Sequence, residues 1–345
     1  MLGGGVFVTQ NKTLPGSYIN FVSTQRASAN LGERGIVAIA LPLEKAEGTV
    51  IEITRAEFNA NSQQLLGKAY ESDDVAPLRE IFKHAHRVYI YDLGATKSAL
   101  NACTALEPYE FNVLCAYTDE SADITNYINS IKTWRDEMGK KCQLVVYNTP
   151  NANYEGIINV VSTVSDEGAD AHALVAWVAG AEAGCEVNES CTNMAYDGEY
   201  AVVCDKTQSA LEDCLENGQM AFHLVYGEVR VLEDINSLIE LTADKGEDFR
   251  YNQTIRVVDQ IANDIAKLFN TKYLGKIPNN NAGRVSLWAD IVAHHRKLEA
   301  IQAIEDFDSA LVTVEQGENK KTVVVNDAVK VVNAMAILYM TVVVQ

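Results

Sequence analysis

The sequence predicts an α/β protein in which an acidic α/β domain precedes a C-terminal domain with two long helices and a β-sheet. Between residues 36 and 225, short runs rich in β-branched residues alternate with helical stretches, a pattern typical of helices packed on a sheet. After about residue 240, two long helical periods and further strand-like runs follow. We therefore divide the chain into an extended N-terminal arm (1–30), the acidic α/β domain (31–240) and a C-terminal domain (241–345).

The first 30 residues are expected to form an extended arm. They show no helical period, and Leu14-Pro15-Gly16 predicts a turn between two short extended pieces. An arm of this kind cannot bury a core of its own, so it needs a sheet to join. The candidate strand residues of this arm are Val6, Phe7, Val8, Tyr18, Ile19, Phe21 and Val22.

The acidic domain contains seven predicted strands and six predicted helices. The strands are expected at Ile36–Leu41, Val50–Ile53, Val88–Tyr91, Asn112–Ala116, Gln143–Tyr147, Val202–Val203 and His223–Val225. The helices are expected at Ala56–Leu66, Val75–His84, Lys97–Leu106, Ser121–Met138, Ala169–Ala183 and Ser209–Asn217.

The C-terminal domain begins with two amphipathic helices. Apolar residues at three- and four-residue steps mark the first helix at Ile255, Val258, Ile261, Ile265 and Leu268. The second carries Trp288, Ile291, Val292, His295, Leu298 and Ile301. Three strand-like runs follow, at Ala310–Glu315, Thr322–Asn326 and Leu338–Val344.

The last of these runs is a candidate for pairing between subunits. Its pairing residues are Leu338, Tyr339, Met340, Val342, Val343 and Val344. A β-branched apolar strand needs partners along its edges, because an exposed edge templates association. The two chain ends therefore pair either within their own chain or across chains, by adding strands to a neighbour's sheet.

The charge is concentrated in the middle of the chain. The 345 residues carry 28 Lys and Arg against 47 Asp and Glu, a net charge of −19. Residues 31–240 hold 14 of these bases and 34 of the acids, net −20, so both ends are nearly neutral. Direct nucleic-acid binding is disfavoured, because it requires cations that neutralise phosphates. The neutral ends can pack against other protein with little repulsion.

Signatures of catalysis and cofactor binding are absent from the sequence. It lacks a phosphate-binding Gly-x-x-x-x-Gly-Lys loop, a dinucleotide fingerprint, a Gly-x-Ser-x-Gly elbow and a His-Glu-x-x-His motif. The seven cysteines lie mostly in apolar runs and form no Cys-x-x-Cys pair, which favours reduced thiols of a cytosolic protein. No signal peptide or apolar stretch of the ~18–20 residues needed to cross a bilayer is visible. We predict a protein that is not an enzyme, with no cofactor, metal centre or membrane insertion.

Two histidine pairs are the strongest residual candidates for chemistry. His84 and His86 could offer metal ligands, but no third ligand lies close in sequence, and a helix-to-strand junction explains both. His294 and His295 lie on the second long helix, where adjacent positions point to different faces. We expect one of them to pack beside Trp288 and the other to meet solvent or a partner.

The remaining candidates have structural interpretations. Acidic doublets such as Asp73-Asp74 arise by chance among 47 acids and are typical of loops and helix N-caps. Cys185 and Cys191 are six residues apart and could form a disulfide, although free thiols are favoured.

Several segments resemble the sheath protein of contractile phage tails and of phage-tail-like bacteriocins. The strongest match runs from Asp248-Phe-Arg-Tyr-Asn-Gln-Thr-Ile-Arg through Lys276-Ile-Pro-Asn-Asn-Asn-Ala-Gly-Arg284 to Ile304-Glu-Asp-Phe307. Further matches are Leu14-Pro-Gly-Ser-Tyr-Ile-Asn-Phe21, Tyr147-Asn-Thr-Pro-Asn-Ala-Asn-Tyr154, Ala176-Trp-Val-Ala-Gly-Ala181 and the C-terminal run Leu338–Val344. These segments extend from one end of the chain to the other.

The resemblance implies a structural and mechanical protein. Sheath subunits stack as hexameric rings in a helix around an inner tube, and contract to drive the tube through a cell envelope. Residues 31–240 would then be an outer domain, and residues 241–345 an inner domain whose sheet is completed by the arms of neighbouring subunits. The implied partners are other sheath subunits, the tube protein, and baseplate and terminator or collar proteins. Assembly would occur in the bacterial cytoplasm, before release as part of an extracellular particle.

The resemblance also implies that the two long helices face the inner tube. Residues 250–305 hold eight bases and five acids. Arg284, Arg296 and Lys297 are the first candidates for contacts with acidic tube residues, although each also fits a solvated face. Two other functions stay open from the residues alone: a non-contractile oligomeric shell or tube protein, and an α/β enzyme of unidentified chemistry.

Overall fold

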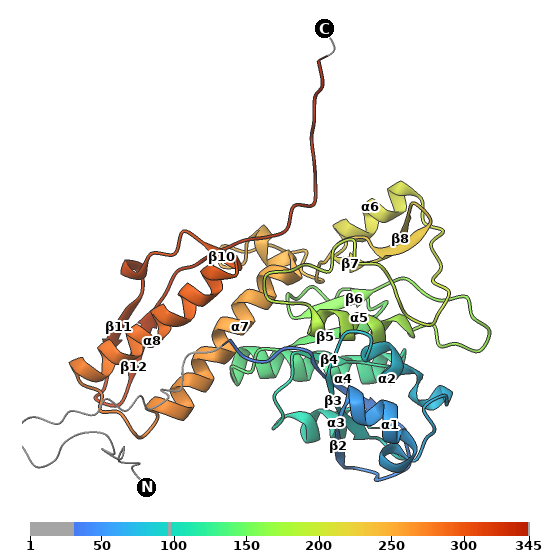
Figure 1. The fold of residues 1–345 in the computed structure, drawn as a ribbon, viewed down its shortest axis with the longest axis horizontal. Coiled ribbons are helices and arrows are strands. Elements are labelled where there is room, and N and C mark those ends of the chain that lie inside the picture. Colours follow the sequence, from blue (N-terminus) through green and yellow to red (C-terminus); the bar gives the residue numbers. More distant parts are fainter. Residues whose placement is uncertain (1–30, 96–97, 344–345) are drawn as a thin grey trace, which may run out of the picture.

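The computed structural model describes residues 31–95 and 98–343. The candidate arm strands before residue 31, and the last candidate pairing residue, Val344, lie outside the described residues. The described chain forms an α/β domain and an elongated C-terminal part, which occupy opposite ends of the molecule (Figure 1). Within the described ranges, no helix combines the length and apolar character required to span a bilayer.

The α/β domain is built on a seven-stranded sheet with helices on both faces. Its strands are β1 Ile36–Leu41, β2 Val50–Thr54, β3 Arg87–Asp92, β4 Val113–Cys115, β5 Gln143–Tyr147, β6 Ile157–Val160 and β7 Gln219–Met220. Its helices are α1 Arg55–Leu66, α2 Ala76–Ile81, α3 Ala99–Leu106, α4 Ser121–Lys132, α5 Leu174–Gly184 and α6 Gln208–Glu216. A hairpin of β8 Phe222–Val225 and β9 Glu228–Val231 follows.

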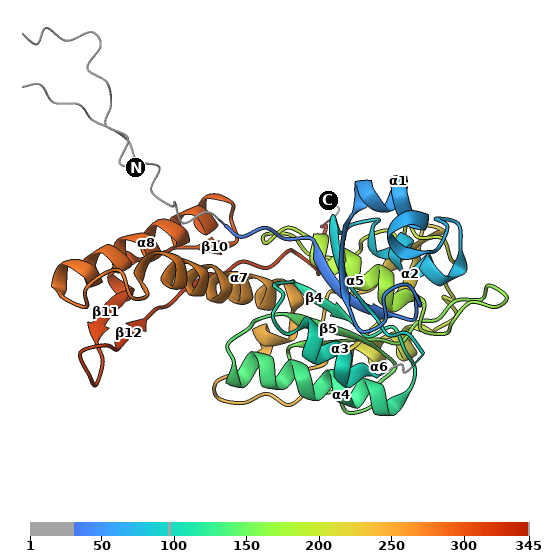
Figure 2. The ribbon, with the colours of Figure 1, turned by 90° about the horizontal axis from the view of Figure 1, so that it is seen from below.

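The strand order is β2-β3-β1-β4-β5-β6-β7, with β2 antiparallel to β3 and the other neighbours parallel. Figure 2 shows α1, α2 and α5 on one face of the sheet, and α3 and α4 on the other. All six residues of the central strand β1 are buried, because Val37, Ile39 and Leu41 face one core and the alternate residues face the second. Burial on both faces explains why this strand is a continuous apolar run in the sequence.

The predicted strands agree with the sheet except near its far edge. The predicted strand Val202–Val203 is wrong: Val202 forms only an isolated bridge with Val164. The sequence analysis also missed β6 and the two-residue β7, and the predicted strand His223–Val225 is β8 of the separate hairpin. It missed β6 because the polar Asn159 interrupts its short apolar run. The Asn159 side chain is buried and exchanges hydrogen bonds with the backbone of Thr149 (2.8 and 2.9 Å), so the sheet accepts it without an unpaired polar group.

The C-terminal part consists of two long helices and short strands. They are α7 Asn252–Leu268, α8 Asn281–Ala300, β10 Ile304–Glu305, β11 Thr313–Gln316, β12 Val323–Asn326 and β13 Lys330–Val331. β11 pairs with β12 as an antiparallel hairpin, and β10 pairs with β13. The contiguous core of this part is formed by residues of both helices and the segments around β10 to β12.

Both predicted long helices are present, but α7 buries more than its apolar stripe. Ile255 and Leu268 are buried, whereas Val258, Ile261 and Ile265 are only half-buried. The polar residues that are buried on this helix are Asn252, Gln253, Thr254, Arg256, Asp259, Gln260 and Asp264. The reason is that α7 lies between α8 and the α/β domain, and its polar side chains find hydrogen-bonding partners on that second side.

Candidate functional site at the roots of the chain ends

A cluster of buried charged residues lies where α7 meets the α/β domain. The Arg256 guanidinium on α7 donates to Glu182 of α5 (2.6 Å), to Asp234 after β9 (3.3 Å) and to the carbonyl oxygen of Glu189 (2.7 Å). None of the three charged side chains is more than 2% exposed. We call Glu182, Asp234 and Arg256 the polar junction.

The two carboxyl groups of the polar junction have pKa values shifted in opposite directions. Burial raises the pKa of Glu182 well above its usual value, and the neighbouring Asp234 raises it further. Burial alone would also raise the pKa of Asp234, but Arg256, together with hydrogen bonds from Glu182 and the Cys191 N–H, holds it below its usual value. Burial thus favours the neutral form of Glu182, whereas Arg256 favours the charged form of Asp234.

The polar junction has ligand atoms that a metal ion could use, yet its arrangement is that of an ion pair. Atoms of Glu182, Cys191 and Asp234 lie within 4.8 Å of one another. The guanidinium of Arg256 already supplies positive charge to both carboxyl groups, so a metal ion would have to displace it. Cys185 and Cys191 are free thiols, and a hydrogen bond from the Cys191 thiol lowers the pKa of Cys185. The sequence offered no signal for this cluster, because its members are far apart along the chain.

A second buried ion pair fixes the middle of α7. Arg135, in the helical turn after α4, donates to both oxygens of Asp259 at 2.5 and 2.9 Å. The two side chains are 5% and 8% exposed. One turn further, the Asn263 amide exchanges hydrogen bonds with the backbone of Lys141. The C-terminal part is thus joined to the α/β domain by side chains along α7, and not only by the covalent chain.

The N-terminal root is the segment of residues 31–35, which leads into β1. Arg34 donates to the carbonyl oxygens of Glu182 and Cys185 at the end of α5 (2.9 and 3.0 Å). Burial lowers the pKa of Arg34 to about 10, so it stays charged at neutral pH. The Gly32 N–H donates to the carboxylate of Asp264 on α7 (3.0 Å). This root therefore bonds to both parts of the molecule.

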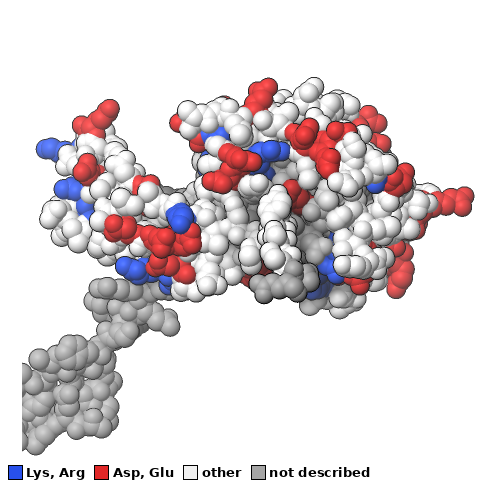
Figure 3. Space-filling model, turned by 90° about the horizontal axis from the view of Figure 1, so that it is seen from above, with Lys and Arg blue, Asp and Glu red and all other residues white. Residues whose placement is uncertain are grey.

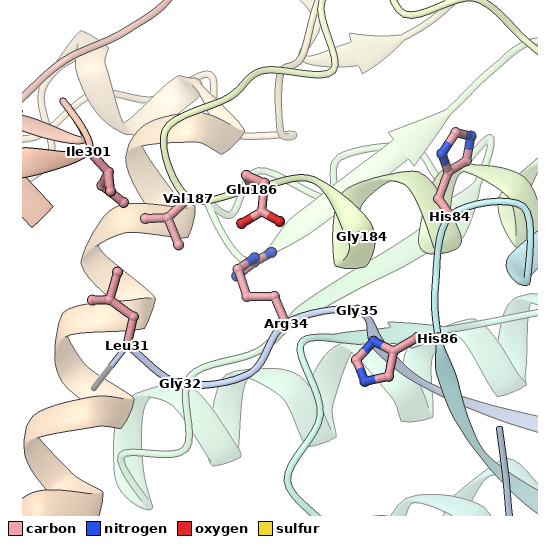
Figure 4. Close-up of a pocket in the computed structure, with 10 residues that line it drawn as sticks. All are labelled: Leu31, Gly32, Arg34, Gly35, His84, His86, Gly184, Glu186, Val187 and Ile301. Carbon is pink, nitrogen blue, oxygen red and sulfur yellow. The ribbon is translucent and has the colours of Figure 1, made fainter. Parts of the chain in front are cut away.

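A cavity of about 290 Å³ opens beside this root. Figure 4 shows its apolar side, formed by Leu31, Val187 and Ile301, and the imidazoles of His84 and His86 at its other side. His84 lies 3.1 Å from Asp197, and His86 lies 2.9 Å from Glu33. Each histidine thus has its own carboxylate partner. Both histidines lie at the junction between α2 and β3, in line with the interpretation that a helix-to-strand junction explains this pair.

The expectation for His294 and His295 is wrong. Both side chains are buried, at 1% and 0% exposed, and they contact each other through their Nδ1 atoms at 3.2 Å. His294 faces Asp264 on α7, and His295 faces Asp327 beyond β12. Adjacent positions do point to different faces of α8, but α7 covers one of these faces and the segment after β12 covers the other.

The C-terminal root is anchored, and the segment beyond it is exposed. Thr254 and Asn333 are hydrogen-bonded through their side chains (3.1 Å), and the Ala334 N–H donates to Gln253 (2.8 Å). From there the chain extends away from the body of the molecule (Figure 1). Leu338 is 84% exposed and Tyr339 91%. The described part of this segment ends at residue 343. It forms no strand, and its predicted pairing residues are exposed to solvent.

The three candidate tube-facing residues do not form one cluster. Arg284 lies in the first turn of α8 and donates to the side chain and backbone of Asn279. Arg296 and Lys297 lie near the other end of the helix, roughly 18 Å away at 1.5 Å per residue. Arg296 is exposed and lies 3.3 Å from Glu299, whereas Lys297 is partly buried.

Arg284 belongs, together with Lys321, to what we call the basic tip of the C-terminal part. It lines a hollow of about 100 Å³ with Leu274, Ile277 and Lys321, between the α7–α8 connection and the β11–β12 hairpin. The Asn279 amide joins the two walls by donating to the carbonyl oxygen of Thr322 (2.9 Å). Figure 3 shows acidic side chains spread over the α/β domain, and acidic and basic side chains together on the C-terminal part.

Family models identify both parts of the chain. The phage tail sheath protein central domain matches residues 94–237, and the phage tail sheath C-terminal domain matches residues 244–345. Together they cover more than half of the sequence. The chain belongs to the phage tail sheath family. Members of this family are structural proteins, which confirms the prediction that the chain is not an enzyme.

Individual relatives match a large part of the chain. Two Bacillus subtilis (strain 168) proteins, the uncharacterised protein YqbK and the phage-like element PBSX protein XkdK, are each 30% identical over 267 residues. The match covers 72% of this tail sheath chain and 57% of each relative, so the chain spans little more than half of their length.

Solved sheath proteins share the fold. The sheath tail protein of Desulfitobacterium hafniense is 26% identical, with a TM-score of 0.81 over 93% of this chain and 98% of that one. The helical sheath of the anti-feeding prophage, in its contracted state, has a TM-score of 0.70 over 96% of this chain and 99% of its own, at 16% identity. The predicted α/β class is thereby confirmed.

Proposed function

We propose that this chain is the sheath subunit of a contractile tail or tail-like injection particle. It polymerises as helical, hexameric rings around an inner tube and contracts to drive that tube through the envelope of a target cell. Family membership and the shared fold of the anti-feeding prophage sheath support this function. The observation that carries it is the C-terminal segment, which is anchored at Asn333 and Ala334 and then exposes a row of apolar residues.

An exposed apolar segment of this kind requires a partner. Burial of apolar area contributes about 25 cal/mol per Å², and an extended chain gains backbone hydrogen bonds when it joins a sheet edge. The β11–β12 hairpin is two-stranded and exposes Val324 and Val325, 44% and 38% respectively. We propose that Leu338–Val344 of one subunit, together with the arm strands Val6–Val8 and Tyr18–Val22, completes such sheets in neighbouring subunits.

Truncation of the two arms tests this proposal. Separate variants lacking residues 1–22 or residues 337–345 should fail to form sheath cylinders in electron micrographs. Both keep the described contacts of residues 31–35 and 333–334, so their circular dichroism and thermal unfolding should stay close to those of the full chain. A truncated chain that still forms cylinders would refute the arm mechanism. Cylinders of a single length under all conditions would favour a non-contractile shell or tube.

The inner tube is the second proposed partner, with baseplate and terminator or collar proteins at the two ends of the sheath. Arg284 at the basic tip, and Arg296 and Lys297 at the other end of α8, would contact acidic tube residues. Neutralising the three together should weaken tube binding at low salt more than at high salt, because the attraction is screened. Unchanged binding at both salt concentrations would contradict this assignment. Assembly would take place in the host cytoplasm, and the particle would act outside the cell.

A further inference from the structure

Four side chains form a continuous line through the C-terminal part. The carboxylate of Asp264 lies 2.9 Å from Nε2 of His294, and the Nδ1 atoms of His294 and His295 are 3.2 Å apart. Nε2 of His295 lies 2.5 Å from the carboxylate of Asp327. Both imidazoles are buried, and the side chains of Asp264 and Asp327 are 6% and 25% exposed.

The line links the N-terminal root to the segment that leads into the C-terminal root. Asp264, on α7, accepts the Gly32 N–H of the N-terminal root and the Gln260 amide. Asp327 precedes β13 (Lys330–Val331), from which the chain continues into the exposed C-terminal segment. The two histidines lie side by side on α8, between these two carboxylates. A change in the proton count of the histidine pair would therefore alter the contacts of Asp264, which holds the N-terminal root, and of Asp327, which precedes the C-terminal root.

With both carboxylates ionised, the geometry is self-consistent for one count of ring protons only. Each Nε2 faces a carboxylate, so each must carry a proton to donate. The two Nδ1 atoms face each other, so one must donate and the other accept. The pair therefore holds three ring protons, which means one neutral imidazole and one imidazolium.

Other proton counts break a contact. With two ring protons, either two Nδ1 lone pairs oppose each other or one bare Nε2 faces a carboxylate. With four, two Nδ1–H groups oppose each other and two positive rings lie in contact. Because the pair is buried, neither arrangement can be relieved by solvent without moving a ring.

The surroundings contain few other charges. Of the described residues, Asp264 from α7 and Asp327 from the segment after β12 are the charged groups in hydrogen-bonding contact with the rings. The Phe307 ring covers His295 edge-on, with centroids 5.1 Å apart. Arg296, on α8 itself, lies 5.8 Å from the centroid of the Phe307 ring, and Glu299 accepts the Phe307 N–H. Phe307 thus borders the pair and is itself held by these two charged side chains.

We propose that the His294–His295 pair is a pH-sensitive latch that holds the roots of both chain ends while it carries one extra proton. Acidification adds a fourth ring proton and opens the latch, and alkaline pH removes the third proton and opens it too. The consequence for sheath assembly rests on the proposed function, because the roots carry the proposed arms. The latch itself is a property of the single chain and can be measured without assembly.

Nitrogen NMR of the full chain, labelled with ¹⁵N at its histidine rings, tests the proton count. At the pH of greatest protection, the pair should show one neutral and one positively charged ring, or two exchange-averaged rings with intermediate Nδ1 shifts. Two neutral rings at that pH would overturn the proposal. This measurement needs no mutation, so a failure of variants to fold does not affect it.

Hydrogen exchange tests the latch. The Gly32 amide donates to Asp264, and the Val332 amide donates to the Ala303 carbonyl oxygen. Both amides should lose protection against hydrogen exchange when the pH moves to either side of an optimum, after correction for their intrinsic exchange rates. The loss should be about tenfold, as expected for one charge-assisted hydrogen bond. His294→Gln and His295→Gln should remove this pH dependence, whereas His223→Gln, on the distant β8 strand, should keep it.

The outcomes separate the latch from the sheath function. A pH profile of protection that is flat in the wild type, or unchanged in both Gln variants, would overturn the latch even if cylinders form normally. A normal profile in a chain that never forms cylinders would instead contradict the proposed sheath function and leave the latch standing.

Discussion

At the scale of single residues, Arg256 is expected to have a large effect on stability. It is fully buried and is bonded to two carboxyl groups and a carbonyl oxygen. In Arg256→Met the charge of Asp234 would be left uncompensated, which typically costs about 3–5 kcal/mol of unfolding free energy. Denaturant unfolding measures this loss. Lys267→Met, at a 63% exposed position, is the matched control and should leave the unfolding midpoint unchanged. Equal midpoints for both variants would contradict the role of the polar junction.

Glu182 gives the polar junction a defined pH dependence. Burial raises its pKa well above 4.5, so the folded chain keeps a proton that the unfolded chain releases as the pH rises. Its contribution to stability is therefore fully present below pH 4.5 and is lost as the pH rises through the folded-state pKa. Glu182→Gln removes this titration, so its unfolding free energy should rise relative to wild type across that window. Glu110→Gln, at an 84% exposed position, should track wild type throughout.

At the scale of elements, the close approach of α5 to the end of α2 depends on a glycine. A Cβ atom at Gly180 would lie 2.4 Å from the carbonyl oxygen of Ile81, which is backbone and cannot rotate away. Gly180→Ala should destabilise the α/β domain by about 1–3 kcal/mol, as overpacking does. The control is Gly246→Ala, where nothing lies within 4 Å of the added methyl group. Thermal unfolding of the two variants should differ clearly, and equal unfolding temperatures would show that α2 can shift.

At the scale of the whole molecule, the charge distribution bears on the proposed contraction. Residues 31–240 carry a net charge of −20, and contraction would bring these domains closer together. Because the repulsion is screened by salt, low ionic strength should favour the extended sheath and high ionic strength the contracted one. The fraction of contracted particles in electron micrographs at increasing NaCl concentration measures this. An opposite trend in the absence of divalent cations would contradict the argument.

The sequence by itself determined much of the fold, because local patterns encode it. Continuous apolar runs such as Ile36–Leu41 and Gln143–Tyr147 became central parallel strands with the predicted bounds. The three- and four-residue period predicted α7 and α8. The quoted segments also led to the sheath family, since they span the whole chain. β6 was missed because Asn159 breaks its apolar run, and its buried hydrogen bonds cannot be inferred from composition.

Only the tertiary structure decided how the two parts are joined and which polar residues matter there. Glu182, Asp234 and Arg256 are separated by tens of residues, so nothing local marks them as one cluster. Likewise, the periodicity of α8 placed His294 and His295 on different faces, but it could not show that α7 and the segment after β12 cover those faces. Periodicity reports which side of an element is apolar. The burial of a polar side chain depends on what the rest of the chain brings to it.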